Sequence, residues 1–182
     1  MKTTFTSAGG AAVAEPSQEI RDEIVNWLKD AYAMERGLES SLEKQSHDNE
    51  LDAAVRERAS KHLEETKRHA EEVRAALQSL DADTSALKTG MGVMGQGMKG
   101  LTSQFAADQH IKDLLDAYTM EHFEIASYTS LEAAAEHAGF TQVVEMCRRI
   151  IPDEERMAAT LIEAIPHETV GYLFKEGHLS TR

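Results

Sequence analysis

Cysteine is almost absent from this chain of 182 residues, and its scarcity limits both the chemistry and the location to be expected. Cys147 is the only one, so no intramolecular disulfide can form, and a reducing compartment, the cytoplasm, is predicted. A lone cysteine within an apolar helical stretch is more typical of a small buried side chain than of a catalytic thiol. Redox chemistry at sulfur is therefore not expected.

Apolar runs and basic residues are scarce as well. No uninterrupted apolar run approaches the roughly 18 residues that a membrane span needs. Residues 1–16 are interrupted by Thr, Ser and Gly, which predicts a flexible tail rather than a secretory signal. The 19 Lys and Arg against 32 Asp and Glu give a formal charge of −13, which repels phosphate backbones and anionic lipid. Nucleic acid and membrane surfaces are thus excluded as partners, and metal cations are favoured.

The sequence does contain an internal repeat. Asp30-Ala-Tyr-Ala-Met-Glu35 returns as Asp116-Ala-Tyr-Thr-Met-Glu121, and the pair Glu64-Glu65 after the first copy is echoed by Glu154-Glu155 after the second. Each copy lies in a helical hairpin that places glutamates at mid-helix. Because a carboxylate buried without a partner costs free energy, two such hairpins facing each other suggest a shared metal site.

Apolar residues at helical spacing predict an all-α, ferritin-like four-helix bundle over residues 17–182, preceded by the tail. The expected helices run from an N-cap at Ser17 to about Gln45, from a cap at Asp48-Asn49 to about Asp81, from near Ser103 to a C′ glycine at Gly139, and from Thr141 to Ile165. Pro152 is expected to kink or split the last helix, and Pro166 to end it. A short amphipathic helix with Val170, Tyr172, Leu173 and Phe174 is expected to follow as a lid.

Residues 81–102, rich in Gly and Met, are predicted to form a long crossover that brings the second hairpin in from the far end of the bundle. No Gly-Lys-Ser/Thr ending precedes a helix, which excludes a phosphate-binding loop. Met91, Met94 and Met98 within this segment suit adaptable packing better than ligation of a soft metal.

Helical rise brings four glutamates to one level. Glu35 and Glu65 lie at nearly equal distances from the bend of the first hairpin, and Glu121 and Glu155 at nearly equal distances from Gly139. These four carboxylates are therefore predicted to be metal ligands on four helices.

Two further residues are candidate ligands. His69 shares a helix face with Glu65, and Glu124 shares one with Glu121. A second histidine is missing at Ala158 and Ala159, so nitrogen is expected on one half of the site only, and the His69 half should load metal first. His62 is expected at the rim or in an outer shell. Arg68 offers an alternative, because it can pair with an inward carboxylate and leave the site free of metal.

Several phrases match a known family in the right order: Leu28-Lys-Asp-Ala-Tyr-Ala-Met-Glu35, His62-Leu-Glu-Glu-Thr66, Met120-Glu-His-Phe-Glu-Ile-Ala-Ser-Tyr128 and Asp153-Glu-Glu155. Over roughly residues 18–165 the chain resembles the YciE/YciF-like family of bacterial ferritin-like, rubrerythrin-related proteins. The resemblance implies a stress-associated role, dimerisation and a metal centre. In that centre the carboxylates that correspond to the four ferritin-like ligands are Glu35, Glu65, Glu121 and Glu155, and Glu124 corresponds to the additional glutamate of rubrerythrins. No rubredoxin-type Cys-x-x-Cys is present, which excludes a complete rubrerythrin electron chain.

These observations predict a cytoplasmic, homodimeric stress protein that binds a divalent transition metal, namely iron, manganese or a mixture, and acts on oxygen or peroxide. Whether it turns over as an enzyme is left open. The alternative is a non-catalytic dimeric scaffold or binding protein whose acidic core is neutralised by Arg68 or by protons.

Overall fold

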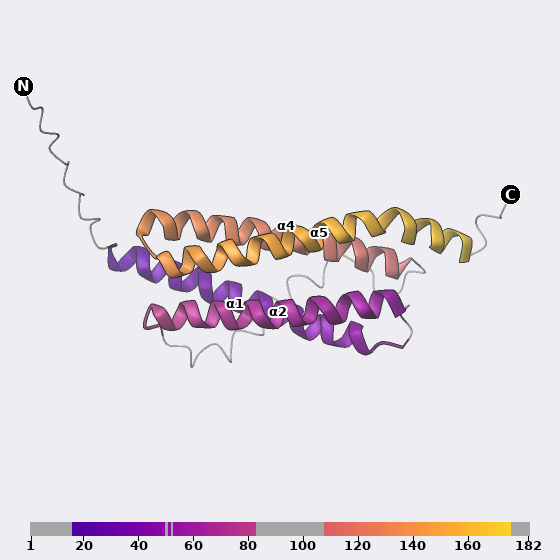
Figure 1. Ribbon diagram of the computed structural model, residues 1–182, viewed down its shortest axis with the longest axis horizontal. Helices are drawn as coiled ribbons and strands as arrows, with labels where there is room; N and C mark the ends of the chain where they lie inside the picture. Colours follow the sequence, from indigo (N-terminus) through magenta and orange to yellow (C-terminus); the bar gives the residue numbers. More distant parts are fainter. Residues whose placement is uncertain (1–15, 50, 52, 83–107, 176–182) are drawn as a thin grey trace, which may run out of the picture.

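The described part of the chain consists of two helical hairpins stacked side by side (Figure 1). The computed structural model describes residues 16–49, 51, 53–82 and 108–175. Helices α1 (Gln18–His47) and α2 (Ala53–Ser79) form the first hairpin, and α4 (Gln109–Ala138) and α5 (Thr141–Lys175) form the second. Packing within each hairpin is more extensive than packing between α2 and α5 or between α1 and α4. The predicted four-helix bundle is confirmed.

Two helix ends form where the sequence predicts them. The Ser17 hydroxyl accepts a hydrogen bond from the Ile20 backbone N–H, which caps α1. At the same end of the bundle, Gly139 closes α4 in the left-handed conformation, with φ 78°, and its N–H donates to carbonyls of the last helical turn. The tail, most of the Gly-Met crossover and the expected helix start near Ser103 lie outside the described residues.

The last helix differs from the prediction, because α5 runs without interruption through both prolines to Lys175. The expected end at Pro166 and the separate lid helix after it are therefore wrong. A proline deprives the carbonyl four residues earlier of its helical donor, and here the residues concerned, Arg148 and Ile162, are exposed, so water can bond to those carbonyls. The extension is also held by His110 of α4, whose Nε2 lies 3.0 Å from Glu168 Oε2.

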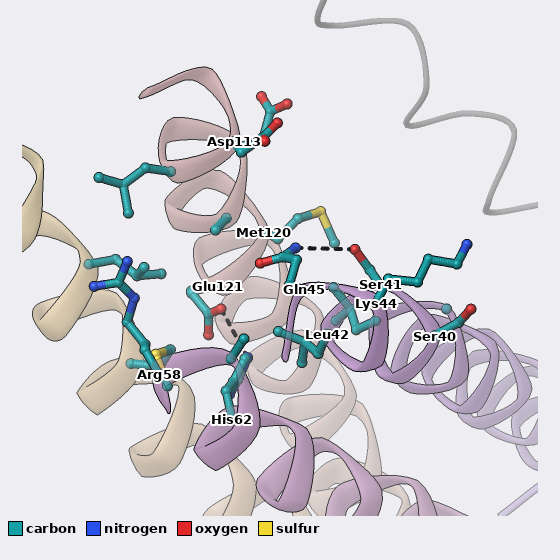
Figure 2. Close-up of a pocket in the computed structure, with 18 of the residues that line it drawn as sticks. Ser40, Ser41, Leu42, Lys44, Gln45, Arg58, His62, Asp113, Met120 and Glu121 are labelled. Carbon is teal, nitrogen blue, oxygen red and sulfur yellow. Dashed lines mark hydrogen bonds and ion pairs between the residues drawn. The ribbon is translucent and has the colours of Figure 1, made fainter. Parts of the chain in front are cut away.

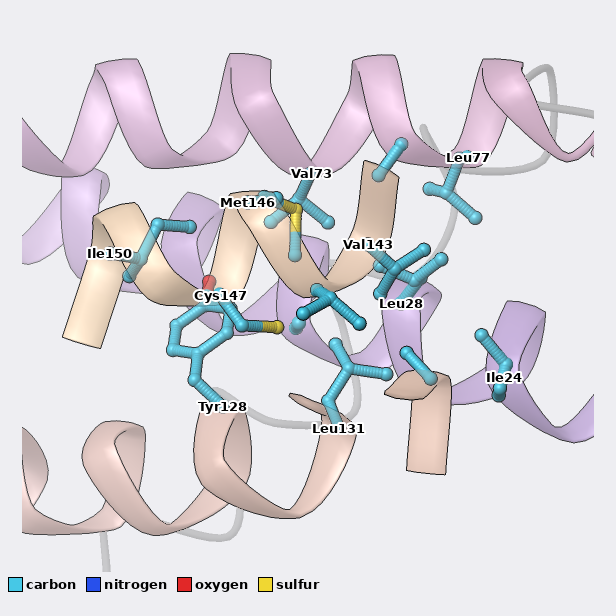
Figure 3. Packing of buried hydrophobic residues seen from close by; sticks show 14 of the residues in the cluster. Ile24, Leu28, Val73, Leu77, Tyr128, Leu131, Val143, Met146, Cys147 and Ile150 are labelled. Atoms are coloured by element: carbon cyan, nitrogen blue, oxygen red, sulfur yellow. The ribbon is translucent and has the colours of Figure 1, made fainter. Parts of the chain in front are cut away.

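Apolar packing is concentrated in the half of the bundle that contains the start of α1, the end of α2, the end of α4 and the start of α5 (Figure 3). We call this the packed half. Its centre consists of side chains that are at most 1% exposed, among them Ile24, Leu28, Val73, Leu77, Tyr128, Val143, Met146, Cys147 and Ile150. Burial raises the pKa of the Cys147 thiol to about 12, in keeping with a structural rather than a reactive role. None of the described helices combines the length and apolar character needed to cross a bilayer.

Candidate metal centre

Six ionisable side chains are buried at mid-length, where the two hairpins face each other. Each is between 0 and 5% exposed: Glu35 of α1, His62 and His69 of α2, Glu121 and Glu124 of α4, and Glu154 of α5. We call them the His/Glu cluster. Side chains of this kind are seldom buried so completely unless they are paired or bind a metal. The cluster is therefore the candidate functional site.

The cluster lies inside because its members fall on the inward face of each helix. On α5, Glu154 stands four residues after Ile150 and three before Met157, and all three side chains are buried. On α2 the buried positions recur at spacings of three and four residues: His62, Thr66, His69 and Val73. The apolar stripe that packs the bundle thus also places these polar groups at its centre.

Ligand atoms of the cluster form two overlapping groups. In the first, His62, Glu121, Glu124 and Glu154 each offer an atom within 4.8 Å of the others, and in the second Glu35, His69 and Glu154 do the same. Each group contains one imidazole, and Glu154 belongs to both. Two histidines and three carboxylates around a shared fourth carboxylate form a donor set that suits a pair of divalent transition-metal ions.

The donor atoms approach one another without forming hydrogen bonds. His69 Nδ1 lies 2.8 Å from Glu154 Oε1, and His62 Nε2 lies 3.2 Å from Glu121 Oε1, yet both nitrogens lack a hydrogen-bond partner. Of the nine buried side-chain nitrogen and oxygen atoms without a partner in the described part of the chain, eight belong to the cluster. Unpaired buried polar atoms are costly, and their concentration at one place fits bound cations for which these side chains would be ligands.

No lysine or arginine among the described residues contacts the four buried carboxylates. Their ion-pair partners within 4 Å are histidines of the same cluster, such as His69 for Glu35 and Glu154. Arg68, the alternative internal counter-ion, is half exposed and pairs instead with Asp153 and Glu72. The acidic core must therefore be neutralised by protonated histidines, by protonated carboxyls or by metal.

Burial and mutual repulsion shift the pKa values in the cluster. Burial raises the pKa of Glu35 to about 8, although the nearby His69 opposes the shift. The pKa of Glu121 is raised and that of Glu124 well above its usual range, in both cases chiefly by burial. Burial lowers the pKa of His69, but the carboxylates of Glu154 and Glu35 outweigh it and raise the pKa overall. The metal-free cluster thus retains protons that a bound metal would displace.

Two neighbours fix the orientation of cluster residues. The Tyr128 hydroxyl, fully buried, donates a hydrogen bond of 2.5 Å to Glu35 Oε1. On the outer side, His69 Nε2 lies 3.0 Å from Arg68 Nη2 and 3.4 Å from Asp153 Oδ2, and Asp153 also pairs with Arg68 and Arg156. Asp153 and Arg68 together hold the ring with Nδ1 toward the centre. Where Nε2–H donates to Asp153, Nδ1 is free to bind a metal.

The structure brings four of the six sequence-predicted residues together, namely Glu35, His69, Glu121 and Glu124. Glu155, which was predicted to be a ligand, is exposed, and the neighbouring Glu154 occupies the inward position instead. One residue changes the direction of a helical side chain by about 100°. Glu65 is 27% exposed and pairs with Arg156 at 2.7 Å, so it lies at the edge of the cluster, outside both groups.

The expected shortage of nitrogen on one half of the site is also corrected. A second histidine is missing from α5 at Ala158 and Ala159, but α2 supplies one to the cluster as His62. The positions of the apolar residues around each helix could have indicated both His62 and Glu154. Ala59 and Leu63 flank His62 on the buried face, and Ile150 and Leu161 align with Glu154 rather than with Glu155.

A cavity of about 660 Å³ adjoins the cluster on the side away from the packed half. It lies between the hairpins, and both His62 and Glu121 form part of its wall (Figure 2). The first metal-ligand group is thus open to molecules that enter the cavity. His69 has no part in this wall.

Comparison with known proteins agrees with this description. A solved structure from Xanthomonas campestris pv. campestris is 30% identical with a TM-score of 0.71, and the match covers 87% of this chain and 99% of that one. The Escherichia coli stress protein YciF is 21% identical with a TM-score of 0.67, over 84% and 98% of the two chains, a likeness of fold. The resemblance inferred from the sequence is thus confirmed. The family model described as "Domain of unknown function (DUF892)" matches residues 19–173, and the chain belongs to this family.

Proposed function

We propose that the His/Glu cluster binds two divalent transition-metal ions, with Glu154 as the carboxylate common to both. The observation that carries the proposal is the set of eight buried donor atoms that lack hydrogen-bond partners and converge from four helices. Imidazole with carboxylate suits iron and manganese, and we propose iron as the principal metal. Glu65 and Glu155 are outside this ligand set, and His62 and Glu154 are added to it.

A bound iron pair would supply electrons to oxygen or peroxide, and this is the activity we propose for the site. Residues of the chain would hold and orient the metal ligands. Glu154 would hold both positions together, Asp153 would orient His69, and Tyr128 would fix Glu35. The cavity beside His62 would give small molecules access without opening the packed half.

Metal analysis of adjacent-residue variants tests the ligand set. After anaerobic loading with ferrous iron and desalting, plasma mass spectrometry should find about two ions per wild-type chain. Glu154→Gln should lose most of both ions, because its carboxylate belongs to both groups. Glu155→Gln, one residue away and exposed, is the matched control and should load like wild type. Full loading of Glu154→Gln, or an empty wild-type protein, would contradict the proposal.

The raised pKa values favour a second candidate function, a metal-free binding or scaffold protein. With Glu35 near 8 and Glu124 well above its usual range, protons alone can neutralise part of the core at neutral pH. The same loading experiment separates the two functions. Absence of iron and manganese from wild-type protein after loading would support the scaffold.

The assembly and biological setting are proposals as well. We propose a homodimer in the cytoplasm with a role in stress, on the family resemblance and on the likeness to the Escherichia coli stress protein YciF. Light scattering on the intact chain should give twice the 20.1 kDa chain mass. The mass of a single chain would contradict the homodimer.

A further inference from the structure

The cavity beside the cluster has the size and lining of a binding site for an organic molecule. Its volume of about 660 Å³ lies within the range of small-molecule sites. Apolar side chains from all four described helices surround it, including Leu38, Leu42, Val55, Leu114, Met120 and Leu161. Oxygen or peroxide alone would need far less space, and an apolar lining is unfavourable for peroxide.

Among the described residues, two basic side chains of the wall, Arg58 and the exposed Lys44, have no hydrogen-bond or ion-pair partner. Arg58 is half-buried on α2, one turn before His62, and forms neither a hydrogen bond nor an ion pair. The other arginines of the described part all have a partner, as Arg36 has in Glu39 and Arg156 in Glu65. In a chain with a net charge of −13, an arginine left unpaired at a cavity indicates an anionic ligand.

Apart from Glu121 of the cluster, the acidic groups of the wall are Asp113 and Asp116. Asp113 is exposed on α4 and accepts a hydrogen bond from Gln109, while Asp116 is half-buried on the same helix. Figure 2 shows Asp113 well away from His62, whereas Arg58 stands one turn from His62 on α2. The positive group is thus next to the inner wall.

We propose that this cavity binds an amphipathic organic carboxylate, with the carboxylate on Arg58 and the apolar part along the leucine and methionine wall, as the substrate class of the first metal-ligand group. The identification as a substrate rests on the proposed metal function, but the binding does not. Arg58 and the apolar wall are present whether or not metal is bound.

Two glycines provide a matched steric test. A Cβ added at Gly37, which lines the cavity, or at Gly171, which does not, meets no other atom within 4 Å. Gly37→Leu, which has room for its Cβ, should therefore fill part of the cavity, and Gly171→Leu should leave it unchanged. Calorimetric titration of chelator-treated full chain with octanoate should show at least a tenfold loss of affinity in Gly37→Leu only. Equal affinities in the two variants would overturn the cavity as the binding site.

Three probes of equal chain length test the charge: octanoate, octanol and octylamine. Octanoate should bind best, and Arg58→Gln should reduce its affinity by about ten- to hundredfold while leaving octanol unchanged, because a charged hydrogen-bonded pair is lost. Preference for octylamine would show that Asp113 and Asp116 determine the ligand, and would overturn the proposal. Equal binding of all three, or no binding, would overturn it too.

Metal-free and metal-loaded protein must be compared to keep the two proposals apart. If the wild type takes up no iron or manganese yet binds octanoate through Arg58, the metal function fails and the carboxylate site stands. If it loads metal and octanoate does not bind, the carboxylate site fails alone. In manganese-loaded protein, bound octanoate should show paramagnetic broadening of its proton resonances, and its absence would overturn the placement beside the metal.

Discussion

The two halves of the bundle, on either side of the His/Glu cluster, are built differently. The packed half contains large side chains buried to 0 or 1%, such as Leu28, Leu77 and Ile150. The other half, which we call the open half, has a small buried group of Leu114, Met157 and Leu161, and beside it the cavity. One set of four helices thus provides tight apolar packing at one end and space for a ligand at the other.

The difference extends into the cluster. His69 faces the packed half, where Asp153 lies behind its ring and Glu35 is fixed by Tyr128. His62 faces the open half, and its nearest outer carboxylate, Glu65, is 3.7 Å away and directed toward Arg156. One metal position is therefore preorganised by its surroundings, and the other is accessible.

The largest expected difference between the two halves is the loss of stability when a core side chain is truncated. Leu77→Ala in the packed half should reduce the free energy of unfolding by about 4–5 kcal/mol, because the rigid surroundings cannot collapse into the space. Leu161→Ala should cost about 2 kcal/mol, since its side chain already borders a cavity. Urea unfolding of the chelated protein, with helical content checked by circular dichroism, measures both. Equal losses would show that the open half is packed as tightly as the other.

The stability of the metal-free protein should fall by a few kcal/mol as the pH rises from about 5 to about 8.5. Glu35, with its pKa raised from 4.5 to about 8, keeps a proton in the native state that the unfolded chain releases, so its contribution is full below 4.5 and is lost up to about 8. His62 and His69 act in the same direction. Their raised pKa values contribute stability below 6.5 that disappears as the pH passes through the raised values.

Saturating manganese should reverse this dependence, because the metal replaces those protons. Unfolding in urea at several pH values, with chelator or with metal, measures the difference. Glu35→Gln should flatten the slope of the metal-free protein, and Glu155→Gln should leave it unchanged. A metal-free protein that becomes more stable with rising pH would contradict the assigned pKa shifts.

Much of this arrangement could be predicted from the sequence, since helical periodicity, the Ser17 cap and the Gly139 end depend on local chemistry. Helical rise also placed Glu35 and Glu121 at one level. An error of one residue changes the predicted height of a side chain along the helix by only about 1.5 Å, but it changes the predicted direction by about 100°. The assignment of Glu155 in place of Glu154 therefore failed in direction while its height was nearly right.

His62 and the cavity were missed for a different reason. A histidine beside apolar residues can be either a metal ligand or a residue at the edge of the site, and the partner of His62, Glu121, is distant in sequence. The cavity depends on how far the two hairpins stand apart, which is a tertiary property that neither hairpin's sequence specifies. The continuation of α5 past Pro166 likewise depends on the exposure of the carbonyl that loses its donor.

Asp153→Asn should weaken metal binding at the His69 position by about tenfold to a hundredfold, since the carboxylate that orients the imidazole is lost. Binding at the His62 position should change much less, because Asp153 has no contact with it among the described residues. Anaerobic calorimetric titration with ferrous iron would resolve two events in the wild type and show one of them weakened. Asp113→Asn, at the mouth of the cavity, is the control, and a uniform loss at both positions would contradict the division.

The smallest effect concerns the helices of the open half themselves. Gly37 lies inside α1 beside the cavity, with space around the position of a Cβ, so Gly37→Ala should raise the free energy of unfolding by about 0.5–1 kcal/mol through helix propensity alone. Gly171→Ala has the same space but lies in the last turns of α5, where fraying should reduce the gain. Urea midpoints of the two variants measure the difference. A full gain at Gly37 would show that the open half consists of formed helices with a space between them, whereas no gain would show that α1 is only partly helical there and that the contrast between the halves is one of local order.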